Sequence, residues 1–178
     1  MRIILGLLLF FAISYADTID EGVSAYENQQ YKKAFELLSP SQGSNSTAQY
    51  YLALMHFKGL GTLANPQKAF ELMQQSANIG NKYGLDGMGF IYEYGIEEIN
   101  IAIDYNTSFM WYHRAVKAGN IESKCNIVVS LIEKSKNDIK KSGSAEMYAH
   151  LLVKEARGKI NYPKCEEVWT KYNLSKYE

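Results

Sequence analysis

The chain has 178 residues, of which 47% are hydrophobic and 13% aromatic, enough to bury the core of one domain of common size without a metal. Its 19 Lys and Arg residues balance its 19 Asp and Glu residues. No net field therefore favours DNA, RNA or anionic lipid as a partner. The composition predicts a single globular domain that does not bind nucleic acid.

Residues 1–16 have the pattern of a secretory signal peptide. Arg2 supplies a positive charge, an uncharged apolar run extends from Ile3 to Ile13, and small residues stand at Ser14 and Ala16. The run is shorter than the roughly 20 residues that a membrane-spanning helix needs. We predict cleavage near Ala16 and a mature chain, residues 17–178, exported to a bacterial periplasm without membrane insertion. The alternative is an N-terminal anchor that stays uncut.

An internal repeat organises the middle of the chain. Leu52 matches Met88 and Gly59 matches Gly95 at an offset of 36, while Gly80 matches the later Gly119 at an offset of 39. A fixed period of this length predicts stacked units of supersecondary structure. We therefore predict full repeats over 48–80 and 84–119, the second with a longer loop over 95–108, and a degenerate repeat over 123–158.

Each repeat reads as a helical hairpin. Apolar residues recur at helical spacing, and no run shows the sustained alternation of a strand. Gly59 and Gly61 end the first helix of the first repeat, and Asn65-Pro66 suits the start of the second helix. Gly80 and Gly119 end the second helices in the same way. The pattern predicts an all-α protein.

These residues carry a family resemblance. The first repeat has Ala48, Leu52, Gly59, Gly61, Lys68, Ala69 and Gly80, and the second has Gly89, Tyr92, Gly95, Trp111, Tyr112, Ala115 and Gly119. In both, the pattern resembles the Sel-one-like repeat (SLR), a relative of the tetratricopeptide repeat. The match is strong over 48–120 and weak outside. Two departures stand out, Ala53 in place of the usual Gly and a second loop without the usual second Gly.

The resemblance implies a right-handed superhelical solenoid of tetratricopeptide-like hairpins, with the first helix of each hairpin on the concave side. Residues 17–43 resemble an N-terminal hairpin, and residues 163–174 resemble a C-terminal capping helix. Transferring the tetratricopeptide pattern of groove positions predicts a partner-binding groove. Its residues are Tyr50, Leu54, Phe57, Lys58, Tyr83, Asp86, Phe90, Glu93, Tyr94, Glu122, Val129 and Glu133.

The two cysteines, Cys125 and Cys165, are separated by close to one repeat length, which puts them at nearly equivalent positions on neighbouring first helices. A zinc site needs four ligands at tighter spacing, and exported thiols tend to oxidise. Because adjacent helix axes lie about 8–10 Å apart, a disulfide requires the two side chains to point towards each other. We predict a disulfide that joins the cap to the array.

The sequence offers no set of residues suited to catalysis. The three histidines, His56, His113 and His150, are far apart, and no serine stands in a nucleophile elbow. No glycine pattern matches a phosphate-binding loop, and the S-x-x-K, S-D-N and K-T-G motifs of β-lactamase-like enzymes are missing from the sequence. We predict a protein that is not an enzyme and has no catalytic residue, metal, cofactor or small-molecule substrate.

A function in protein binding follows from the resemblance. Small exported SLR proteins include immunity proteins that neutralise phospholipase-type toxins of type VI secretion, and a short array with a signal peptide best suits that group. The predicted partner is then a toxin effector, inhibited by occlusion with the groove or the 95–108 loop. The alternatives are a periplasmic scaffold or adaptor that binds a component of an envelope machine for secretion or motility, and an SLR protein that contacts host factors.

Overall fold

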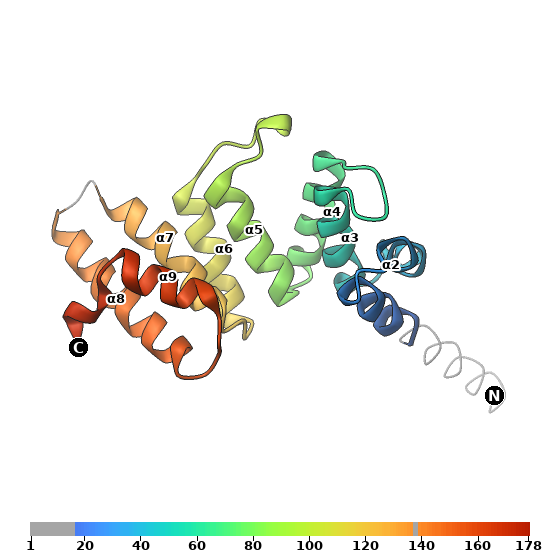
Figure 1. Cartoon of the computed structure of the whole chain (residues 1–178). Coiled ribbons are helices and arrows are strands. Elements are labelled where there is room, and N and C mark those ends of the chain that lie inside the picture. Colours follow the sequence, from blue (N-terminus) through green and yellow to red (C-terminus); the bar gives the residue numbers. More distant parts are fainter. Residues whose placement is uncertain (1–16, 137–138) are drawn as a thin grey trace, which may run out of the picture. The chain divides into compact units, whose positions relative to one another are not determined.

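A computed structural model describes residues 17–136 and 139–178, with side chains of the helix that follows residue 138 described from Ala145 onward. Figure 1 shows the chain. The predicted signal peptide, residues 1–16, lies outside the described residues. The described chain is helical apart from turns and one isolated β-bridge, which confirms the predicted all-α class. Internal contacts divide the chain into two units, with the boundary between Ile79 and Gly80.

The first unit contains two helical hairpins. Residues 17–27 form a helix that is followed by α2 (Tyr31–Leu38) and the short 3₁₀ helix η1 (Ser39–Ser41). The second hairpin pairs α3 (Ser46–Lys58) with α4 (Pro66–Asn78). Its core consists of small and apolar side chains spaced along both helices, namely Ala48, Leu52, Ala53, Met55, Ala69, Leu72, Met73 and Ala77.

Capping residues set the ends of these helices, and the sequence predicts Gly59 and Asn65-Pro66 among them. The side chain of Asn45 accepts hydrogen bonds from the backbone N–H groups of Thr47 and Ala48, so it caps α3. Asn65 caps α4 in the same way, ahead of Pro66 at the first helical position. Gly59 ends α3 in the left-handed conformation, with φ +68°. Each loop is therefore fixed by local chemistry.

The second unit contains two further hairpins and a final helix. Helix α5 (Lys82–Tyr94) pairs with α6 (Tyr105–Lys117), and α7 (Ser123–Ser135) pairs with α8 (Ile139–Arg157). Helix α9 (Pro163–Lys171) and the 3₁₀ helix η3 (Leu174–Tyr177) follow. Helix α7 contacts α5, α6, α8 and α9, so it is the central element of this unit.

A glycine allows α5 and α6 to approach closely. A Cβ atom at Gly89 of α5 would lie 2.5 Å from the Tyr112 ring of α6, and Tyr112 is among the largest fully buried side chains of the described residues. The backbone carbonyl of Gly89 also accepts a hydrogen bond of 2.8 Å from the buried Ser108 hydroxyl. Ser108 in turn lies 2.6 Å from the Ser130 hydroxyl of α7. The absence of a side chain at Gly89 thus lets α5 and α6 pack closely, and Ser108 links both helices to α7.

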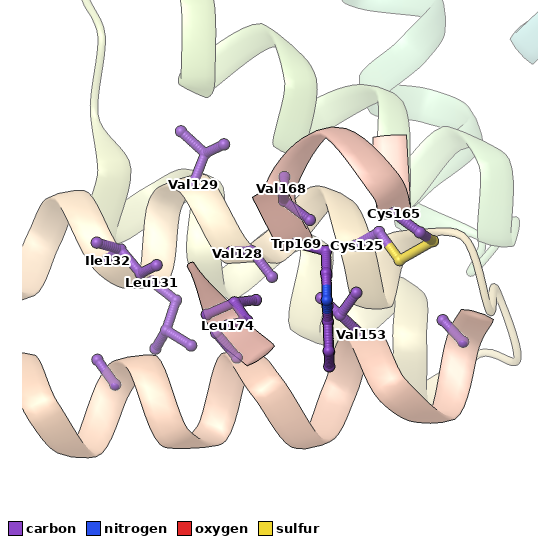
Figure 2. Close-up of a cluster of buried hydrophobic side chains, with 13 residues drawn as sticks. Cys125, Val128, Val129, Leu131, Ile132, Val153, Cys165, Val168, Trp169 and Leu174 are labelled. Atoms are coloured by element: carbon purple, nitrogen blue, oxygen red, sulfur yellow. A yellow bond between two sulfur atoms is a disulfide. The ribbon is translucent and has the colours of Figure 1, made fainter. Parts of the chain in front are cut away.

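The largest apolar cluster of the second unit lies between α7, α8 and α9. It combines Val128, Val129, Leu131 and Ile132 of α7 with small residues and Val153 of α8 and with Val168 and Trp169 of α9 (Figure 2). Leu174 of η3 completes the cluster and is fully buried. Helix α9 therefore covers the end of the second unit, as the predicted capping helix should.

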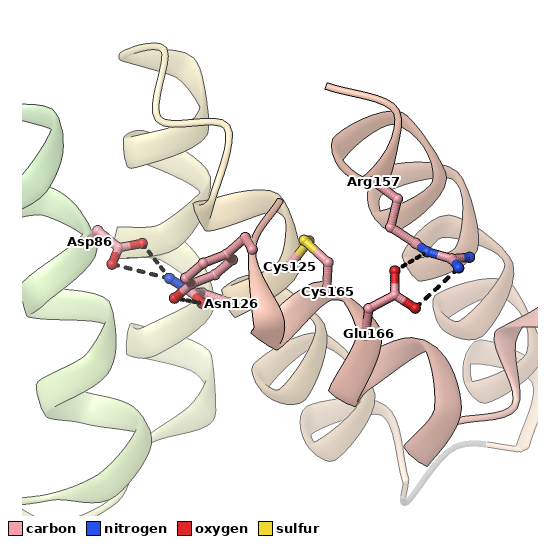
Figure 3. The surroundings of a disulfide bond; sticks show 7 residues. Asp86, Cys125, Asn126, Arg157, Cys165 and Glu166 are labelled. Atoms are coloured by element: carbon pink, nitrogen blue, oxygen red, sulfur yellow. Dashed lines mark hydrogen bonds and ion pairs between the residues drawn. A yellow bond between two sulfur atoms is a disulfide. The ribbon is translucent and has the colours of Figure 1, made fainter. Parts of the chain in front are cut away.

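A disulfide joins this final helix to the central one. Cys125 of α7 and Cys165 of α9 are bonded with their Cα atoms 5.0 Å apart, and both side chains are buried. Figure 3 shows the bond beside the ion pair of Arg157 with Glu166, whose N–O distance is 2.6 Å. The predicted disulfide is confirmed. Such bonds are typical of oxidising compartments outside the cytosol.

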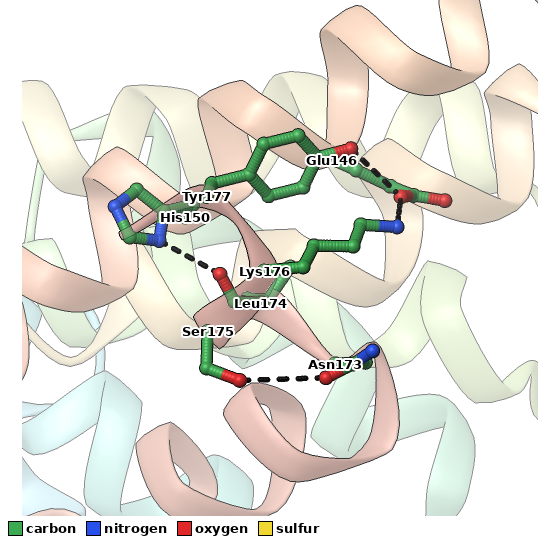
Figure 4. A network of polar contacts seen from close by, with 7 residues as sticks. All are labelled: Glu146, His150, Asn173, Leu174, Ser175, Lys176 and Tyr177. Atoms are coloured by element: carbon green, nitrogen blue, oxygen red, sulfur yellow. Dashed lines mark hydrogen bonds and ion pairs between the residues drawn. The ribbon is translucent and has the colours of Figure 1, made fainter.

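Polar contacts hold the last residues against α8 (Figure 4). The Nδ1 atom of the buried His150 lies 2.9 Å from the Leu174 carbonyl oxygen. Because a carbonyl can only accept, this nitrogen carries the proton. The Glu146 carboxylate pairs with Lys176 and accepts a hydrogen bond of 3.0 Å from the Tyr177 hydroxyl. The C-terminal turn is therefore part of the packed structure.

The predicted loop over 95–108 is shorter in the structure, because α6 begins at Tyr105, and residues 95–104 are ordered by their own contacts. Gly95 ends α5 with φ +73°, a conformation that favours glycine. An isolated antiparallel bridge then joins Ile96 to Ile101 around the 3₁₀ helix η2 (Glu97–Ile99). The Asp104 side chain accepts hydrogen bonds from the first turn of α6 and so caps it. Glu97 and Glu98 are exposed at the tip.

Breaking the disulfide should destabilise the second unit. In a double Cys125→Ala, Cys165→Ala variant, we expect the free energy of unfolding to fall by about 4 kcal/mol, because the bond closes a loop of about 40 residues and restricts the unfolded chain. Urea denaturation at pH 7 measures the change. The same fall in the free energy of unfolding is expected when the wild-type protein is unfolded in urea, reduced with a dithiol and then measured again in the reduced form. An unchanged midpoint in both experiments would contradict this role.

Gly89→Ala should lower the free energy of unfolding by about 1–3 kcal/mol, because the added methyl group overlaps the Tyr112 ring and both helix backbones resist displacement. Gly43→Ala is the matched control, since a Cβ atom there meets nothing within 4 Å, and we expect a change within about 0.5 kcal/mol. Thermal unfolding followed by circular dichroism compares the two. Equal stability of both variants would show that Tyr112 moves aside without cost.

Candidate partner-binding surface

Three exposed aromatic side chains follow one face of α5. Tyr83, Phe90 and Tyr94 are 43%, 48% and 53% exposed, and we call them the aromatic row. Their spacing of seven and four residues places them on one side of the helix. The opposite side is buried through Leu85, Met88 and other apolar or small residues. The Phe90 and Tyr94 rings contact each other, with centroids 4.6 Å apart. Most of the predicted groove positions on α5 thus present aromatic surface.

A carboxylate lies at the edge of this row, between α5 and α7. Asp86 accepts a hydrogen bond of 2.5 Å from the Ser123 hydroxyl. The Asn126 amide donates to both oxygens of Asp86, at 2.9 and 3.1 Å (Figure 3). The Tyr162 hydroxyl donates to the Asn126 side-chain oxygen at 3.1 Å. Burial raises the pKa of Asp86, and the nearby charge of Glu122 adds to the rise.

A second carboxylate lies deeper in the unit. Glu93 of α5 is buried and accepts a hydrogen bond of 3.0 Å from the Tyr112 hydroxyl of α6. Burial raises the pKa of Glu93, while hydrogen bonds from Tyr112 and Tyr94 and the charge of Lys164 oppose the rise. Lys164 of α9 also pairs with Glu167 at 3.3 Å. Glu93 therefore joins α5 to α6 and presents little surface to a partner.

The predicted groove residues near α7 occupy different environments. Glu122 is exposed immediately before the helix, and Glu133 is partly exposed and pairs with Lys136. Val129 is buried in the cluster beneath α9. The groove position transferred to Val129 therefore lies in the interior, because the capping helix packs over that part of α7.

In the first unit, the predicted groove residues lie on α3. Phe57 is 42% exposed and Lys58 is exposed, while Tyr50 and Leu54 are partly buried. The Tyr50 ring packs edge-on against Tyr51, with centroids 5.1 Å apart. Helix α3 thus offers its own exposed aromatic residue for binding.

The sequence argument missed several polar residues of the second unit. Ser123, Asn126 and Ser130 are all buried on α7, at a spacing of three and four residues that forms a buried polar stripe along the helix. That stripe is visible in the sequence and could have predicted polar contacts between helices. Tyr162 and Lys164 carry no such signal, because their partners come from α7 and α5.

The described residues contain no group of three or more His, Cys, Asp or Glu side chains placed to hold a metal ion. Within residues 17–136 and 139–178, no helix combines the length and the apolar character that a membrane span requires. The histidines lie in separate packing environments, with His56 against Phe35, His113 against Phe109 and His150 against Trp169.

Tyr112→Phe should lower the free energy of unfolding by about 1–3 kcal/mol, because the buried Glu93 carboxylate loses a hydrogen-bond donor. The same change should raise the pKa of Glu93 further, since the Tyr112 hydrogen bond lowers it. Urea denaturation and a carbon-detected NMR titration of Glu93 measure the two effects. Tyr148→Phe removes an exposed hydroxyl and is the control. If Tyr112→Phe and Tyr148→Phe have the same free energy of unfolding and the same pKa of Glu93, the hydrogen bond from Tyr112 to Glu93 is contradicted.

Comparison with known proteins identifies the repeats. The Sel1 repeat family matches residues 46–81 and 83–120, which contain the two predicted full repeats. Comparison with curated protein sequences finds no match. Sel1 repeat proteins are generally protein-interaction modules.

Two solved structures have the same fold. A Sel1 repeat protein from Oxalobacter formigenes has a TM-score of 0.64 and 18% identity, over 90% of this chain and 73% of that one. The protein c5321, a protective antigen present in uropathogenic Escherichia coli strains and displaying an SLR fold, has a TM-score of 0.60 and 21% identity, over 89% of this chain. The chain spans only 38% of the length of c5321. These likenesses confirm the predicted SLR fold class, and residues 46–81 and 83–120 of the chain are two Sel1 repeats.

Proposed function

We propose that this protein binds another protein through the aromatic row of α5 and catalyses no reaction. The observation that carries the proposal is the exposure of Tyr83, Phe90 and Tyr94, which are each about half exposed on one face of one helix. Aromatic side chains supply a large contact area and lose little conformational entropy on binding, and they are enriched at interface centres.

The aromatic row lies on helix α5, which several contacts hold in place. The Asn81 side chain caps α5 at its first turn, and Gly89 holds the helix tightly against α6. Hydrogen bonds from Ser123 and Asn126 tie α5 to α7. A surface that is already ordered costs less entropy when a partner binds. This support favours recognition of a partner by a preformed face.

The finer form of the proposal is an immunity protein in the periplasm that occludes a phospholipase-type toxin of type VI secretion. The disulfide supports an oxidising, exported setting. The aromatic row offers the contact surface, and the loop over 95–108, with Glu97 and Glu98 at its tip, offers a second element that can reach a partner. The proposal has two alternatives: a scaffold or adaptor of an envelope machine, and an SLR protein that contacts host factors.

A pull-down from native envelope extract tests the proposal. The wild-type protein is compared with a Phe90→Ala, Tyr94→Ala variant and with a matched control, Met147→Ala, Tyr148→Ala, whose residues are exposed on α8. We expect the α5 variant to lose at least about 90% of the captured partner, since truncating two interface anchors costs 2 kcal/mol or more. The control should retain the partner.

The identity of the captured protein separates the finer forms. A lipase-like toxin whose hydrolysis of phospholipid vesicles is inhibited by the wild type, and not by the α5 variant, would support immunity. Components of a secretion or motility machine would support the scaffold instead. Equal capture by the wild type and the α5 variant, with both folded by circular dichroism, would show that the aromatic row is not the binding surface.

A further inference from the structure

We propose that the outer surface of α6 and α8 binds an anionic phospholipid bilayer, with apolar side chains entering the headgroup region and basic side chains contacting the phosphates. The inference goes beyond the proposed function, because none of its residues belongs to the aromatic row or to the predicted groove. It concerns the second unit alone, in which both helices lie.

Successive repeats present similar residues at equivalent positions of α6 and α8, which we call the outer row. The outer row comprises Met110, Trp111, Arg114 and Lys117 of α6 and, 37 residues later in each case, Met147, Tyr148, Leu151 and Lys154 of α8. Three of these four pairs keep a methionine, an aromatic residue or a lysine.

The buried sides of the two helices show the same equivalence. The buried residues Ser108, Tyr112 and Ala115 of α6 are followed, again 37 residues later, by the buried Ala145, Ala149 and Leu152 of α8. Tyr112 and Leu152 also share one buried cluster with Ile127 of α7. Equivalent positions of stacked hairpins face the same side of a solenoid. The outer row therefore forms one surface on the side away from this cluster.

The apolar members of the outer row protrude into solvent. Met110, Met147 and Leu151 are 65%, 52% and 57% exposed. A single exposed apolar residue is ordinary, but a set that recurs at one-repeat spacing indicates a contact surface.

The charged members of the outer row are all basic. Arg114, Lys117 and Lys154 are exposed, and α6 contains no Asp or Glu. Among residues 17–136 and 145–178, no ion pair includes these three side chains, although the Arg114 guanidinium lies 4.3 Å from the Trp111 ring centroid. The acid beside Lys154 in the sequence, Glu155, already pairs with two lysines. This surface is thus positive although the whole chain carries no net charge.

Exposed apolar side chains beside unpaired cations suit an anionic bilayer. The apolar groups enter the boundary between headgroups and acyl chains, while Lys and Arg remain at the level of the phosphates. Trp and Tyr favour the same depth. An acidic protein would match the charges as well, but flexible methionine side chains that protrude need no shaped pocket in a fluid bilayer. The observations therefore favour a lipid surface.

Vesicle co-sedimentation measures this binding with the disulfide-bonded protein in its processed form. Vesicles of phosphatidylglycerol and phosphatidylcholine in equal amounts are compared with vesicles of phosphatidylcholine alone. We expect a partition coefficient at least about tenfold higher on the anionic vesicles, because each basic residue near such a surface contributes a factor of about five. The difference should shrink as salt is added. Equal partition onto both kinds of vesicle would overturn the inference.

Two pairs of variants test the charges. Lys117→Gln, Lys154→Gln should lower partition onto anionic vesicles about tenfold or more. Lys32→Gln, Lys171→Gln is the matched control, since it removes two exposed lysines outside the outer row and changes the net charge equally, and it should bind as the wild type does. All samples carry the same N-terminus, so any affinity of residues 1–16 for lipid is common to them. Equal partition of the two variants would contradict the proposed surface.

Trp111 reports whether the outer row itself contacts lipid. The chain has two tryptophans, and Trp169 is only 9% exposed, so the difference in fluorescence between the wild type and Trp111→Phe isolates Trp111. We expect vesicles with brominated acyl chains to quench the Trp111 signal, and Met110→Gln, Leu151→Gln to reduce both quenching and partition. Bound protein without quenching of Trp111 would place the lipid contact elsewhere and overturn the inference.

The remaining outcomes also decide. If an acidic protein from envelope extract is captured through Lys117 and Lys154 while vesicles fail to bind, the outer row is a protein interface and the lipid inference falls. If a variant of the outer row does not fold, as judged by circular dichroism, the comparison of anionic with zwitterionic vesicles on the wild type still tests the inference.

Discussion

Helix α7 is enclosed by four neighbouring helices, and the second unit depends on how those neighbours share its surface. Its apolar side chains, such as Val128 and Ile132, pack beneath α9 and against α8. Its polar side chains face the other way, where Asn126 bonds to Asp86 and Ser130 lies beside Ser108. Apolar packing supplies most of the stabilisation, and the directional polar bonds select one register between the helices.

The repeat and its helices could be predicted from the sequence because local signals suffice for them. Asn45, Asn65 and Gly59 occupy the cap positions that their chemistry favours, and the offset between the two repeats fixes which helices are equivalent. The Cys125–Cys165 bond followed from the same offset. In each of these cases, residues close in sequence or related by one repeat determine the outcome.

The candidate surface was less predictable, because exposure depends on packing between distant elements. Val129 stands at a groove position in the transferred pattern, yet α9 covers it, and only the fold reveals where the cap lies. Glu93 is buried because Tyr112 reaches it from α6. A pattern of groove positions transferred from a repeat family does not show where an array ends. It also does not show which polar side chains of different helices bond to each other.

The covalent link between α7 and α9 has a topological consequence. Cys125 and Cys165 close a ring of polypeptide that contains α8 and the turns on either side of it. A protease that cuts the chain once within this ring leaves two fragments that remain joined through sulfur, with the α7 and α9 faces still opposed. In an oxidising compartment, where the bond persists, a single cut within this ring therefore leaves α7 and α9 in one molecule.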